Sequence, residues 1–103
     1  MPDVEGSIFI GSTYCYLEQS HPEYDSGMRG AYVGVATKAG SFEEAVSKIS
    51  AELMDIDLVL VGCDDLYDIR FLEDEPSGYF KELIDLLDEF AVGYRNIDLH
   101  PLN

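Results

Sequence analysis

The residues of this chain that are best suited to a direct function are its carboxylates. The stretch from Glu52 to Glu89 has 13 acidic residues and two basic ones, Arg70 and Lys81. Such an excess of one charge attracts basic proteins at long range and complements their side chains on contact. The residues predicted to form a partner-binding surface are Asp64, Asp65, Tyr67, Asp68, Glu73, Asp74, Glu75, Asp85 and Asp88.

The same carboxylates also have a purely structural explanation. The cluster Glu73–Glu75 precedes Pro76, a residue that suits the first turn of a helix. Negative charge near that end of a helix is favoured by the helix dipole, and a run of charges is most often a solvated face. The binding surface is therefore a hypothesis that competes with a simpler one.

Three neighbouring aspartates, Asp64, Asp65 and Asp68, offer the oxygen ligands that calcium and magnesium prefer. Their spacing does not match the calcium-binding loop, which repeats aspartates at alternate positions and ends in a glutamate. We therefore expect neither a metal nor a cofactor.

The two histidines, His21 and His100, each precede a proline, and neither has the spacing of a metal ligand. An alternative function uses them nevertheless: a small ferredoxin-like enzyme or ligand-binding domain with a pocket near His21 and His100. Cys63 is followed by two aspartates, which would raise its pKa, so it is a poor candidate for a nucleophile. Phosphate-binding glycine loops and the GxSxG motif are absent from the sequence.

Seven tyrosines supply side chains of a type that is enriched at protein interfaces. Some are expected to border the core. If Tyr14 and Tyr16, or Tyr67, lie beside the acidic surface, they are the candidate anchors that add affinity to electrostatic attraction.

The formal net charge of −15 excludes several classes of partner. It repels phosphate backbones and anionic lipids, so we expect neither direct nucleic-acid binding nor membrane binding. The two cysteines, Cys15 and Cys63, match no disulfide or zinc pattern. Because Asp3 and Glu5 stand where a signal peptide carries positive charge, we expect a cytoplasmic protein.

Residue patterns predict the elements that position these side chains. Two-residue alternation or short apolar runs predict strands at 7–17, 28–37, 58–61, 67–71 and 94–99, with a polar loop at 18–27. Helical spacing predicts one helix that begins after an N-cap at Ser41 and extends to Ile56. A second helix is predicted from Pro76 to Ala91, with Gly93 as its C-cap.

This order predicts one α+β domain over residues 1–103. We expect a two-layer sandwich in which two helices cover one face of a mainly antiparallel sheet. Without the first strand the pattern is βαββαβ, that of a ferredoxin-like core, so the first strand would be an N-terminal addition. A hairpin of the first two strands would conflict with that core, because it takes the position of the last strand.

Charge without catalytic motifs favours a non-enzymatic acidic protein that binds a basic protein partner. In size and charge the chain is similar to the small acidic immunity and antitoxin proteins of bacteria, and this likeness implies an inhibitor or neutraliser. No motif accompanies the likeness, so it assigns no residue a role. A homodimer formed through a free sheet edge is a further alternative.

Overall fold

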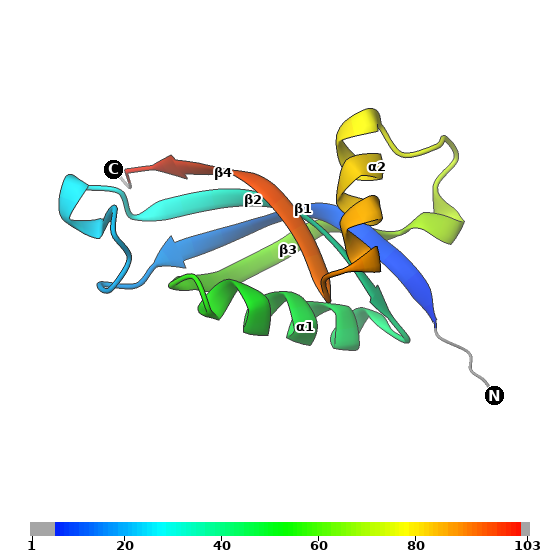
Figure 1. Cartoon of the computed structure of the whole chain (residues 1–103), viewed down its shortest axis with the longest axis horizontal. Helices are drawn as coiled ribbons and strands as arrows, with labels where there is room; N and C mark the ends of the chain where they lie inside the picture. The colour runs from blue at the N-terminus through cyan, green and yellow to red at the C-terminus, as the bar shows by residue number, and fades with distance from the viewer. Residues whose placement is uncertain (1–5, 102–103) are drawn as a thin grey trace.

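The computed structural model describes residues 6–101 as a four-stranded sheet with two α-helices (Figure 1). The main elements in chain order are β1 (Ser7–Leu17), β2 (Gly30–Ala39), α1 (Phe42–Met54), β3 (Leu58–Asp68), α2 (Gly78–Asp85) and β4 (Val92–His100). Three short 3-10 helices lie between them: η1 (Tyr24–Ser26), η2 (Ile69–Phe71) and η3 (Leu86–Asp88). The mainly antiparallel α+β architecture predicted from the sequence is confirmed.

The strand order β3-β1-β2-β4 places the β1–β2 hairpin at the centre of the sheet. All three pairings are antiparallel, and β1 pairs with β2 over nearly its whole length, from Ser7↔Ala39 to Tyr16↔Gly30. The polar residues 18–27 connect these two strands, as predicted, and include η1. β3 and β4 are the edges, and pairing with a second copy at an edge stays a prediction.

A ferredoxin-like core is not confirmed, because the chain runs ββαβαβ with four strands among the described residues. The strand predicted at 58–61 continues without a break to Asp68 as β3, and residues 69–71 of the second predicted strand form η2 instead. Gly62 and Asp65, predicted to lie in a turn, pair with Tyr14 and Ser12 of β1. The register shifts on each side of the Tyr14↔Gly62 pair, because β3 has one more residue than β1 there, and these bulges do not end the strand.

The prediction that both helices share one face of the sheet is corrected. Residues of one parity, such as Cys15 and Val33, pack against Ile49 and Leu53 of α1. Residues of the other parity, Ile10 and Ala36, pack against Leu83 of α2. Successive strand side chains point to opposite faces, so α1 and α2 lie on opposite sides, as Figure 1 shows.

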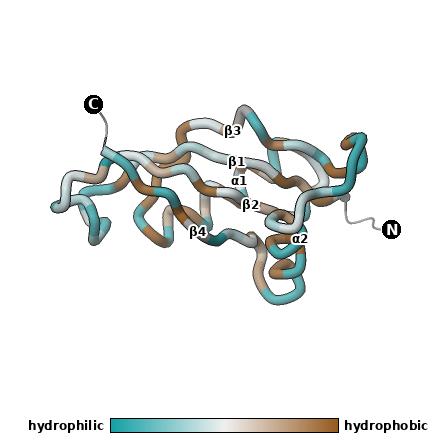
Figure 2. Tube along the Cα trace, turned by 90° about the horizontal axis from the view of Figure 1, so that it is seen from above, coloured by the Kyte–Doolittle hydropathy of each residue, from teal (hydrophilic) through white to brown (hydrophobic). Residues whose placement is uncertain are grey.

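The face that carries α2 is only partly covered. α1 runs along most of the sheet on its side, whereas α2 spans eight residues and stands over one end of the other face (Figure 1). Figure 2 shows that the segment between β3 and α2 is largely hydrophilic and lies at the end of the molecule away from the β1–β2 loop. No helix within residues 6–101 has the length and apolar character needed to cross a lipid bilayer.

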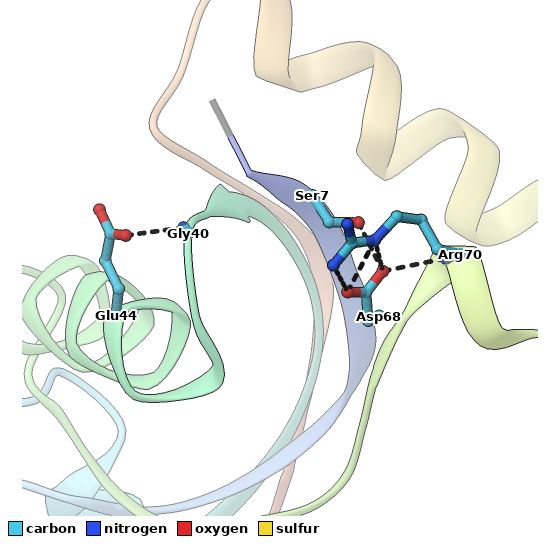
Figure 3. A network of polar contacts seen from close by, with 5 residues as sticks. All are labelled: Ser7, Gly40, Glu44, Asp68 and Arg70. Carbon is cyan, nitrogen blue, oxygen red and sulfur yellow. Dashed lines mark hydrogen bonds and ion pairs between the residues drawn. The ribbon is translucent and has the colours of Figure 1, made fainter. Parts of the chain in front are cut away.

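The start of α1 is as predicted from local capping chemistry, whereas the bounds of α2 differ from the prediction. Ser41 caps α1 as predicted: its Oγ accepts a hydrogen bond from the N–H of Glu44 at 3.1 Å. The Glu44 carboxylate accepts in turn from the N–H of Gly40 at 2.7 Å (Figure 3). α2 begins at Gly78 and is shorter than predicted, and Gly93 lies in β4 instead of capping it.

Candidate functional site

A hollow of about 460 Å³ opens on the α2 side of the sheet. Strands β1 and β3 line one side of it, and the segment 72–77 with the first turns of α2 lines the other. Its lining residues are Ile10, Gly11, Ser12, Asp65, Tyr67, Leu72, Glu73, Asp74, Glu75, Pro76, Ser77 and Phe80. We call this feature the acidic hollow. It brings together five of the nine residues predicted to form a partner-binding surface.

Among the described residues, three carboxylates of the acidic hollow have no ion-pair partner. Asp65, Glu73 and Asp74 are exposed, and none of the ion pairs formed among residues 6–101 includes them. Glu75 differs, because its Oε1 lies 3.1 Å from Nζ of Lys81. The hollow therefore presents uncompensated negative charge to solvent.

Two aromatic side chains give the acidic hollow an apolar component. Tyr67 is 51% exposed, and its hydroxyl lies 3.4 Å from Oδ1 of Asp65. The ring of Phe80 is half-buried and packs edge to face against Tyr79, at a centroid separation of 5.1 Å. A long cationic side chain needs this combination, since its stem is apolar and its end is charged.

Asp68 lies outside the acidic hollow, and its carboxylate is already occupied. Only 10% of its side chain is exposed, and it accepts hydrogen bonds from Ser7 Oγ, from the N–H of Arg70 and from the Arg70 guanidinium (Figure 3). Hydrogen bonds from the Arg70 side chain, with further ones from Ser7 and the Arg70 backbone, hold the pKa of this carboxyl well below its usual range. Asp68 thus joins the end of β3 to the start of β1.

The other predicted acidic residues are not part of the hollow. Asp85 ends α2 and Asp88 ends η3; both are exposed, and neither lines the hollow. The backbone of Asp64 belongs to β3, but its side chain lies outside the described residues. The predicted binding carboxylates whose side chains are described are therefore divided between the hollow, internal bonds and the solvated end of α2.

Neither histidine lines the acidic hollow. His21 lies in the β1–β2 loop, where its Nδ1 accepts a hydrogen bond from the N–H of Glu23 at 3.0 Å. His100 ends β4 and stacks on the rings of Tyr14 and Tyr32. Within residues 6–101 no cluster of three or more potential ligands is arranged to hold a metal ion.

Tyr14, Tyr16, Tyr32 and His100 form a second surface, which we call the tyrosine patch. It lies on the same face of the sheet as α2, beyond the end that α2 covers. A smaller hollow of about 260 Å³, lined by Ser12, Thr13, Tyr14, Tyr32, Gly62 and Asp65, borders it. Ser12 and Asp65 line both hollows, so the two surfaces are continuous.

The sequence indicated only part of this patch. Tyr14 and Tyr16 share a parity in the predicted first strand and were candidate anchors, and Tyr14 does lie beside Asp65. Tyr32 and His100 were not assigned to the surface. The available signal was the position of Tyr32 opposite the buried parity of Ala31 and Val33, which marks it as facing the other side.

Both cysteines pack against the core on the α1 side. Cys15 is fully buried, and desolvation of its thiolate raises the pKa of the thiol to about 11. Cys63 is half-buried beside the same core. This arrangement agrees with the expectation of packed thiols.

Comparisons with protein-family models, with curated proteins and with solved structures each found no match to this chain. Function is therefore inferred from the geometry and charge of the two surfaces.

Proposed function

We propose that this protein is a non-enzymatic binding protein that neutralises or inhibits a basic protein partner. The observation that supports the proposal is the acidic hollow, where three exposed carboxylates that form no ion pair within the described part of the chain surround a partly aromatic cavity. Lysine or arginine side chains of the partner would enter it, with their stems against Tyr67 and Phe80 and their charges at Asp65, Glu73 and Asp74.

The net charge of −15 supports the same proposal at longer range. It accelerates encounter with a basic partner, and the hollow then supplies the contacts that outlast the encounter. A neutraliser of this kind covers a positive surface of its partner with carboxylates, in the manner implied by the likeness to immunity and antitoxin proteins. The proposal places this activity in the cytoplasm.

Isothermal titration calorimetry, which measures the affinity for a defined basic peptide, tests the proposal. The probe is a peptide of alternating lysine and glycine, added to the full chain at low and at high salt. The test variant is Asp65→Lys with Asp74→Lys, which reverses two charges of the hollow. The matched control is Glu43→Lys with Asp55→Lys, which changes the net charge equally but alters exposed residues at the two ends of α1.

We expect binding that weakens as salt rises, because the contacts are exposed ion pairs. The hollow variant should lose roughly tenfold in affinity, and the control variant much less. Equal losses in the two variants would mean that the peptide responds to the total charge alone, and the hollow would then not be the binding site.

A further inference from the structure

The tyrosine patch is a connected array of rings on the uncovered part of the sheet. Tyr14 is its centre, with ring centroids 4.9 Å from Tyr32, 5.8 Å from Tyr16 and 5.7 Å from His100. His100 also stacks on Tyr32 at 5.1 Å. Tyr16 and Tyr32 are 46% and 52% exposed, so much of their ring surface faces solvent.

The backbone of β2 is built to let these rings lie close to the sheet. A Cβ atom at Gly30 would come within 2.7 Å of both the Tyr14 hydroxyl and Cε1 of His100. The Nε2 atom of His100 is buried at this point and has no hydrogen-bond partner among the described residues. The absence of a side chain at Gly30 therefore leaves room for two of the four rings.

Carboxylates border the tyrosine patch on two sides. Asp98 of β4 is directly opposite Tyr32 in the sheet, and Asp65 shares the smaller hollow with Tyr14 and Tyr32. Both aspartates are exposed and take part in none of the ion pairs among residues 6–101. The rings thus lie between negative charges that no ion pair of the described residues neutralises.

We propose that the tyrosine patch binds arginine side chains of the basic partner, an inference that rests on the proposed function and specifies the partner's chemistry. A planar guanidinium stacks on an aromatic ring while its N–H groups donate to a carboxylate beside the ring. A lysine ammonium lacks the flat surface and the fixed fork of donors, so it gains less from the same arrangement.

The chain already contains this type of contact at another place. The guanidinium carbon of Arg29 lies 3.7 Å from the centroid of the Tyr24 ring, while its Nη1 donates to the carbonyl oxygens of Tyr24 and Met28. These bonds occupy Arg29. Arg29 is therefore not available to the tyrosine patch, and the guanidinium that stacks on its rings would come from another molecule.

The continuity of the two surfaces favours one extended segment as the occupant. An extended peptide of about 12 residues spans roughly 40 Å, close to the 47 Å length of the molecule. A segment of this length reaches from the acidic hollow across Ser12 and Asp65 to the tyrosine patch. The occupant is therefore an arginine-bearing segment of the basic partner.

Two peptides of this length test the inference: one alternates arginine and glycine, and the other alternates lysine and glycine. We expect the full chain to bind the arginine peptide about two- to fivefold more tightly than the lysine peptide, which is the scale of one exposed cation–π contact. Tyr32→Leu should remove this preference, and Tyr32→Phe should keep it because the ring remains. Phe90→Leu, which alters an exposed ring at a different hollow, should also keep it.

Gly30→Ala provides a second variant, because its methyl group would clash with the Tyr14 and His100 rings, and Gly30 does not line the acidic hollow. It should reduce the preference for arginine, and near-ultraviolet circular dichroism should report the moved tyrosines. Urea unfolding of each variant checks that the fold is retained.

The outcomes separate this inference from the proposed function. Salt-dependent binding that depends on Asp65 and Asp74 but shows no preference for arginine would overturn the role of the patch and leave the proposed function standing. Binding that neither depends on Asp65 and Asp74 nor prefers arginine would overturn both the proposed function and the role of the patch. A single-stranded oligonucleotide that binds the full chain and fails to bind Tyr32→Leu would assign the patch to bases and overturn the arginine proposal.

Discussion

The guanidinium of Arg70 holds the carboxylate of Asp68 from two residues away. Its Nη2 lies 2.7 Å from Oδ2 of Asp68, and its Nε lies 3.1 Å from the same oxygen. Ser7 of β1 donates to Oδ1 of the same carboxylate (Figure 3). Arg70, one of the two cations in the acidic stretch, is thus bound to a carboxylate of the same chain. Asp68 therefore has a structural role, although it was predicted to be one of the binding residues.

Replacement of this carboxylate should destabilise the protein. Asp68→Asn removes the charge that three donors face, and we expect the free energy of unfolding to fall by about 1–3 kcal/mol. Urea unfolding followed by far-ultraviolet circular dichroism measures it. Asp55→Asn is the control, because Asp55 is an exposed residue at the C-terminal end of α1. Equal transition midpoints for Asp68→Asn and the parent would contradict the structural role.

The difference in stability between the parent and Asp68→Asn should depend on pH. The pKa of Asp68 is lower in the folded protein than in the unfolded chain, so its contribution is fully present above the unfolded value of about 3.9. The contribution shrinks as the pH falls below that value toward the folded pKa. Unfolding of both proteins over a pH series should show the two curves converging at acid pH, and a constant gap would contradict this account.

Gly93→Ala should destabilise the junction of β4 and α2. A Cβ atom there would lie 2.3 Å from the carbonyl oxygen of Leu83, a backbone atom that cannot rotate away. We expect a loss of about 1–3 kcal/mol, as is usual for overpacking. Gly78→Ala is the control, since a Cβ at the first residue of α2 meets open space. A similar result for the two variants in thermal unfolding would exclude the close contact.

Cys15 should react only when the protein unfolds. Burial raises the pKa of its thiol to about 11, so at mildly alkaline pH the thiolate is roughly two orders of magnitude scarcer than for an ordinary cysteine. In a Cys63→Ser background, maleimide labelling followed by mass spectrometry should be slow in the native state and fast in urea. Rapid native labelling would show that the β1 core opens locally.

Local chemistry explains which elements the sequence predicted well. The Ser41 cap, the polar β1–β2 loop and the alternation in β1 depend on neighbours within a few residues, and the structure confirms all three. The continuous strand β3 was missed, because the pairing of Gly62 and Asp65 with β1 is a contact between distant parts of the chain.

The candidate site likewise has features that residue type predicted and features that depend on tertiary contacts. Glu73, Asp74 and Tyr67 could be nominated from residue type, but their meeting with Phe80 and Asp65 depends on how α2 packs against the sheet. Asp68 could not be separated from its neighbours, because its donors include Ser7, 61 residues earlier in the chain. Tyr32 could be placed on a face, and only the pairing of β2 with β1 and β4 brought it to Tyr14 and His100.

By itself the sequence determined that this protein carries a large negative charge, that Tyr14 and Tyr16 share one face of a strand, and that it contains none of the catalytic motifs considered. These properties belong to residues one at a time or to short stretches, whose behaviour is set by backbone geometry and side-chain chemistry nearby. The tertiary structure alone decided that the helices lie on opposite faces, which carboxylates meet in a hollow and which are bonded internally. Those outcomes require burial and pairing between distant segments, and such contacts exist only once the whole chain has folded.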